Sequence, residues 1–95
     1  MRPGISNWSR SDPRSASLPE LKYRELVNLL RYFGTDLRGE GSPQLQALNR
    51  DGQLCRVHCH PGHSFWPQAL VRLLHDLGVS RDEFWDWWQA GRHGR

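Results

Sequence analysis

The pair Asp51-Gly52 constrains the fold more than any other feature, because it lies between two stretches in which apolar and polar residues alternate. An Asp-Gly pair is typical of a two-residue β-hairpin turn, since both residues tolerate the positive φ angles that this turn requires. Residues 44–49 alternate loosely before the pair, and residues 54–60 alternate strictly after it. The sequence therefore predicts two antiparallel strands joined at this turn.

Helices are predicted where leucines and aromatic residues recur at helical spacing, which happens in the segments 17–33, 67–77 and 81–89. Ser-x-x-Glu sequences, typical of capping boxes, open the first segment at Ser17 and precede the third at Ser80. We expect Gly34 to end the first helix as a left-handed cap and Gly78 to close the second. The Gly-rich stretch 35–43 is predicted to be a loop.

The order helix, strand, strand, helix, helix predicts an α+β fold, with a small antiparallel sheet and helices packed on one of its faces. A chain of 95 residues can form one hydrophobic core but not two independent domains. We expect this domain to span 17–90. Residues 1–16 and 91–95 are polar and contain glycine, so they are predicted to be flexible tails.

Charge and composition indicate the partners and the cellular compartment that the protein is suited to. The net charge is +3, and twelve of the thirteen basic residues are arginine, a side chain suited to phosphate. The chain has neither a membrane-spanning apolar run nor a secretory signal, so we expect a cytoplasmic protein that does not bind membranes. Cys55 and Cys59 are then expected to be reduced thiols.

Four short motifs follow one another with a characteristic spacing: Gly41-Ser42, the hairpin around Asp51-Gly52, His60-Pro61-Gly62 and Leu77-Gly78-Val79-Ser80. Over about two-thirds of the chain, this order resembles the HicA family of mRNA interferases, the toxins of bacterial toxin–antitoxin pairs. The resemblance implies a fold like the double-stranded-RNA-binding domain, of order α-β-β-(β)-α, followed here by a Trp-rich helix. It also implies RNA and a HicB-like antitoxin protein as partners, and no cofactor.

The sequence departs from this family after Gly41-Ser42, where Pro43 and Gln44 stand in place of the catalytic histidine. Neither side chain takes up and releases a proton near neutral pH, as ribonuclease action of this kind requires. His60 matches the family's Pro-x-His segment by position, and His58 lies two residues before it. These two histidines are therefore our candidate catalytic residues, and RNA binding is predicted with ribonuclease activity left open.

The predicted strand 54–60 has two chemically different faces. Its apolar face carries both cysteines, and its polar face carries Arg56, His58 and His60. With Arg50 near the turn and His63 beyond the strand, the polar face is either an RNA-contact surface or a solvated sheet face. The residues that we assign to RNA binding are Ser42, Gln44, Arg50, Arg56 and His63.

Two other functions remain open at this stage. The density of cysteine and histidine between positions 55 and 63 is compatible with a small zinc-binding domain, although a strand would direct the cysteines away from His58 and His60, so no metal site is assigned. In the last helix, Phe84 and Trp88 are expected to pack in the core. Trp85 and Trp87 are expected to point outward, as an interface for a partner or for a homodimer.

Overall fold

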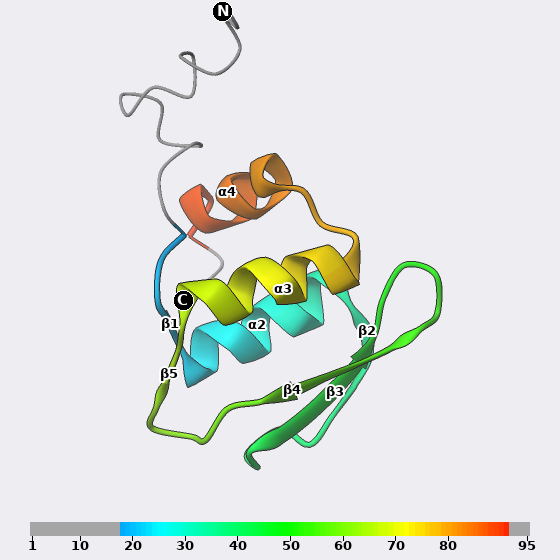
Figure 1. Cartoon of the computed structure of the whole chain (residues 1–95), viewed down its shortest axis with the longest axis vertical. Coiled ribbons are helices and arrows are strands. Elements are labelled where there is room, and N and C mark those ends of the chain that lie inside the picture. Colours follow the sequence, from blue (N-terminus) through cyan, green and yellow to red (C-terminus); the bar gives the residue numbers. More distant parts are fainter. Residues whose placement is uncertain (1–17, 92–95) are drawn as a thin grey trace, which may run out of the picture.

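The computed structural model describes residues 18–91, which form an α+β fold (Figure 1). Three helices and five strands follow one another in this range. In chain order they are β1 (Leu21–Lys22), α2 (Tyr23–Phe33), β2 (Thr35–Arg38), β3 (Gln44–Leu48), β4 (Leu54–His58), β5 (Ser64–Phe65), α3 (Pro67–Leu77) and α4 (Arg81–Gln89). The predicted fold class is confirmed.

The main sheet is antiparallel, with strand order β2-β3-β4, and a second pair is formed by β1 and β5. Figure 1 shows α2 and α3 on the same side of the main sheet, with α4 beyond them. Side chains on that face of β3 and β4 are buried, among them Leu45 at 1% exposure and Ala47 at 0%. The core thus lies between sheet and helices, and the opposite face of the sheet stays open.

The first helix begins later than its sequence predicts. Leu21 and Lys22 form β1, which pairs with β5, and the helix begins at Tyr23. The backbone N–H of Lys22 donates to Glu25 Oε1 at 2.8 Å, and the predicted cap at Ser17 lies outside the described residues. Pairing of β1 with β5 is favoured over an earlier start of the helix because it buries Leu21 completely.

The end of this helix also differs from the prediction. Gly34 follows α2 but has φ = −113°, which is extended and not left-handed. Its role is steric, because a Cβ at this position would lie 2.9 Å from the Leu30 carbonyl oxygen and 3.1 Å from Ala47 Cβ. Gly34 therefore lets the helix end pass close to β3.

Two predicted connections are wrong in detail. The predicted loop 35–43 contains β2, which pairs with β3, and only the tight turn that follows it is irregular. The hairpin between β3 and β4 is a five-residue loop, 49–53, and not a two-residue turn. The Asn49 side chain holds this loop, since its Oδ1 accepts the N–H groups of Asp51 at 2.9 Å and Gln53 at 2.8 Å.

The second and third predicted helices are confirmed. Helix α3 spans Pro67–Leu77 and is capped by Gly78, whose φ of +75° is left-handed. Helix α4 begins with the predicted capping box, in which Glu83 N–H donates to Ser80 Oγ at 3.1 Å and Ser80 N–H donates to Glu83 Oε1 at 2.9 Å. Both helices are specified by local signals at their ends.

The two predicted tails, 1–16 and 91–95, lie outside the described residues apart from Gly91. Within 18–91, no helix combines the length and apolar character that a membrane span needs.

Candidate nucleic-acid interface

The open face of the main sheet, here called the outer face, carries polar and basic side chains in cross-strand rows. Arg38 on β2, Gln46 on β3 and Arg56 on β4 are register partners, so their side chains share this face. In the neighbouring row Gln44 is the partner of His58. The outer face of this three-stranded sheet thus presents two guanidinium groups and an imidazole.

Arg38 reaches the outer face because β2 contains a bulge. Thr35 pairs with Leu48 and Arg38 pairs with Gln46. Four residues of β2 (35–38) therefore lie opposite three residues of β3 (46–48), and one residue of β2 is extra. Asp36 has a φ of +54°, and this backbone conformation accommodates the extra residue of the bulge. The Nε of Arg38 lies 3.3 Å from Asp36 Oδ1. Sequence reasoning missed Arg38, since this segment was predicted to be a loop.

Three histidines gather where β4 ends. The ring of His60 lies 4.8 Å from the ring of His58 and 5.5 Å from the ring of His63, measured between centroids. All three side chains are exposed. A turn brings His63 back, because its N–H donates to the His60 carbonyl at 3.0 Å. The structure therefore groups both candidate catalytic residues with one of the residues assigned to RNA binding.

Gln44 and Ser42 lie beside this histidine group. Gln44 Nε2 and His58 Nδ1 are 3.2 Å apart across β3 and β4. Ser42 Oγ donates to the Gly39 carbonyl at 2.8 Å, so this hydroxyl shapes the turn before β3. The phenol of Tyr23 donates to the Ser42 carbonyl at 2.7 Å and ties the turn to α2. Two hydrogen bonds thus position the turn, one from Tyr23 of α2 and one from Ser42 within the turn itself.

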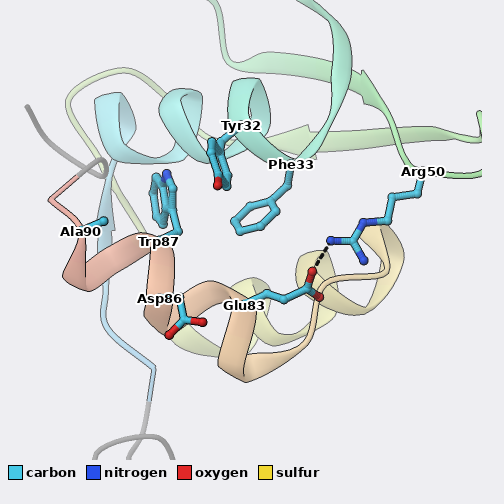
Figure 2. Close-up of a pocket in the computed structure, with 7 residues that line it drawn as sticks. All are labelled: Tyr32, Phe33, Arg50, Glu83, Asp86, Trp87 and Ala90. Atoms are coloured by element: carbon cyan, nitrogen blue, oxygen red, sulfur yellow. Dashed lines mark hydrogen bonds and ion pairs between the residues drawn. The ribbon is translucent and has the colours of Figure 1, made fainter.

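Arg50 is not part of this surface. Its side chain forms an ion pair with Glu83 at the start of α4 and donates to the Gly78 carbonyl at 2.8 Å (Figure 2). The loop that carries Arg50 adjoins the end of the hairpin opposite His58. The structure does not bring Arg50 together with the other residues assigned to RNA binding, because its ion pair with Glu83 holds the side chain against the start of α4.

The Arg50–Glu83 pair has an electrostatic consequence. The hydrogen bond from the Arg50 guanidinium, together with the one from the Ser80 backbone N–H, lowers the pKa of Glu83 from 4.5 to about 2. The same contact raises the pKa of Arg50. Because both side chains are nearly half exposed, water and salt screen the pair, and it fixes orientation more than it adds stability.

The Trp-rich helix differs from its prediction at two residues, because Trp87 is buried and Trp85 packs partly against the core. Trp87 is 3% exposed, and its ring lies 6.1 Å from that of Phe33. Figure 2 shows Trp87 pointing from α4 toward α2. Phe84 is fully buried, as predicted, while Trp85 and Trp88 are half-buried. The prediction that Trp87 points outward is wrong, because residues three and four apart share a helix face and Trp87 follows Phe84 by three.

The cysteines lie on the opposite side of β4 from the histidines. Cys55 and Cys59 are free thiols with exposures of 6% and 5%. Burial raises the pKa of both thiols, and the nearby Asp76 carboxylate raises that of Cys55 further. Within residues 18–91, no three His, Cys, Asp or Glu side chains are placed to hold one metal ion. The buried thiols and the exposed imidazoles therefore lie on opposite sides of the strand, as its alternating pattern predicts.

The sequence matches no family model, and the comparisons with curated proteins and with solved structures gave no match.

Proposed function

We propose that the outer face binds RNA through its phosphates, as a HicA-like domain that contacts messenger RNA in the cytoplasm. The observation that carries this proposal is the cross-strand row of Arg38, Gln46 and Arg56 beside the histidine group. Guanidinium, amide and imidazole groups are the side chains that proteins use to contact phosphate and sugar oxygens.

The chemistry of the outer face favours contacts to the RNA backbone over contacts to bases. Its rows contain no phenylalanine, tyrosine or tryptophan, and the one ring that they present is the small imidazole of His58. The far end of the face is apolar, with Leu54 at 48% exposure, so the basic groups are concentrated toward the histidines. Binding on this face is therefore expected to be electrostatic and strongly dependent on salt.

The order of elements gives the proposal independent support. From α2 to α3 the chain runs helix, the three antiparallel strands of the main sheet, the two-residue strand β5, and helix. Apart from β5, this order corresponds to the α-β-β-(β)-α order that the resemblance to HicA implies, and β2 was not used to recognise that resemblance.

Fluorescence anisotropy with a labelled single-stranded RNA tests this function. We expect affinity to fall steeply with salt, and Arg38→Ala and Arg56→Ala each to weaken binding and to reduce the slope of log K against log salt by about 1. Arg24→Ala is the matched control, because Arg24 is an exposed arginine of α2, outside the outer face. Absent binding, or equal losses in all three variants, would contradict the proposal.

A second candidate activity, RNA cleavage, is favoured by the position of Pro43. Its carbonyl accepts the N–H of Cys59 at 3.0 Å, so the chain position at which HicA proteins have their histidine lies across from the residue between His58 and His60. Two imidazoles in contact can supply the base and the acid for attack of a 2′-hydroxyl on its phosphate. A ribonuclease assay with His58→Ala and His60→Ala tests this candidate: activity lost in both variants supports it, and activity unchanged in both refutes it.

A further inference from the structure

A groove of about 200 Å³ runs between β4 and α3, at the edge of the outer face. Its floor is apolar and is formed by Phe65, Ala69 and Leu73. Its rim carries the polar groups of Arg56, Arg72 and Asp76. An apolar slot with guanidinium groups at its edge is chemically suited to a flat aromatic ring that also has polar edges.

The groove is continuous with the surface proposed to bind phosphates. Arg56 and His58 line the groove and also stand in the cross-strand rows of the outer face. An RNA strand whose phosphates contact these two residues therefore has its bases next to the groove mouth. Since duplex bases are stacked and paired, only an unpaired base can enter.

We propose that this groove holds one unpaired base of a bound RNA strand, with guanine preferred. The inference rests on the proposed RNA-binding function and assigns the base contacts that the outer face lacks. The Watson–Crick edge of guanine presents two N–H donors side by side, which match the two oxygens of the Asp76 carboxylate. Uracil presents one N–H between two carbonyl oxygens, which repel a carboxylate.

The backbone of Asp76 is fixed by contacts with the hairpin, and its side chain is exposed beside the groove. Its backbone carbonyl accepts the Nδ2 hydrogen of Asn49 at 2.9 Å and lies 3.7 Å from Cys55 Sγ. The side chain itself is 54% exposed. Among residues 18–91, the nearest basic contact of the carboxylate is His75 Nδ1 at 3.9 Å, which is too long for a hydrogen bond, so within this range its oxygens are available to a ligand.

Three labelled oligouridylates of equal length test the proposal by anisotropy at one low salt concentration. The first has uridine at its central position, the second guanosine and the third an abasic site. We expect the protein to bind the guanosine oligomer about tenfold more tightly than the abasic one, since base contacts of this kind discriminate by that order. Uridine should fall between them.

The variants separate the base contact from the phosphate contact. Ala69→Leu fills the floor and Asp76→Asn replaces the carboxylate that accepts the guanine N–H groups, so both should abolish the preference for guanosine over the abasic site. Because Asp76→Asn also removes a negative charge beside Arg56, it should raise the affinity for all three oligomers by a similar factor. Asp51→Asn is the control, because Asp51 is an exposed carboxylate of the hairpin loop and does not line the groove. Circular dichroism checks the fold of each variant. If Ala69→Leu does not fold, the result for Asp76→Asn decides the test.

The possible outcomes are distinct. Equal affinity for all three oligomers overturns the base groove but leaves phosphate binding by the outer face standing. A guanosine preference that survives both groove variants also overturns the groove. Failure of the protein to bind any of the oligomers overturns the proposed function together with this inference.

Discussion

The side chain of Asn49 donates a 2.9 Å hydrogen bond to the backbone carbonyl of Asp76, 27 positions later in the chain. This contact fastens the β3–β4 loop to the end of α3. Asn49 is also the one polar residue among those buried in residues 18–91, at 9% exposure. A single amide thus connects the hairpin that carries the outer face to the helix that forms the other wall of the groove.

Replacing Asn49 should therefore destabilise the protein markedly. Asn49→Ala leaves the N–H groups of Asp51 and Gln53 and the carbonyl of Asp76 without this partner, and we expect the free energy of unfolding to fall by about 2 kcal/mol. Urea denaturation measures the change. Gln53→Ala is the control, because within the described part of the chain its exposed amide bonds to Asn49 alone, at 3.2 Å. Equal stability of the two variants would refute this role of Asn49.

The Glu83 carboxylate predicts how stability depends on acid. Its pKa is about 2 in the folded protein and lies below the ordinary 4.5, so the folded state favours the ionised form. The stabilisation is complete above pH 4.5 and is lost as the pH falls toward 2. Glu83→Gln should melt below the wild type at pH 7, by a difference that shrinks over this window.

Thermal unfolding at a series of pH values checks this prediction, with Glu20→Gln as an exposed control. High salt should reduce the difference at pH 7, because the Arg50–Glu83 pair is accessible to ions. A difference that stays constant from pH 7 to pH 2 would show that the charge of Glu83 does not contribute.

Gly34 should not tolerate a side chain. An added Cβ would lie 2.9 Å from the Leu30 carbonyl oxygen and 3.1 Å from Ala47 Cβ, and both neighbours are buried. Gly34→Ala is expected to lower the free energy of unfolding by about 1–3 kcal/mol through this overlap. Chemical denaturation tests it against Thr35→Ala, an exposed neighbour, and an unchanged stability of Gly34→Ala would contradict the steric role.

The elements that the sequence predicts well carry their signals locally. Helix α3 has a proline at its start, four buried leucines at helical spacing and a left-handed glycine at its end. Helix α4 has a complete capping box. The exposure of His58 and His60 follows in the same way from strict alternation along 54–60. Such features depend on residues no more than one or two turns apart.

The features that the sequence missed depend on distant partners. Strand β2 has no apolar alternation and forms by pairing with β3 around the bulge at Asp36, which also directs Arg38 to the outer face. Arg50 was assigned to RNA binding, but it pairs with Glu83, 33 positions away. Local patterns contain no information about such long-range contacts, so they could not place either arginine.

An NMR titration of the labelled protein with single-stranded RNA tests the central claim most directly. It follows the side-chain Nε–H signals of the arginines and the imidazole signals of the histidines at increasing RNA concentration. We predict large shifts for Arg38, Arg56, His58, His60 and His63, and little change for Arg24, which lies on α2 outside the outer face. Shifts confined to the helices, or none at saturating RNA, would contradict the claim that the outer face binds RNA.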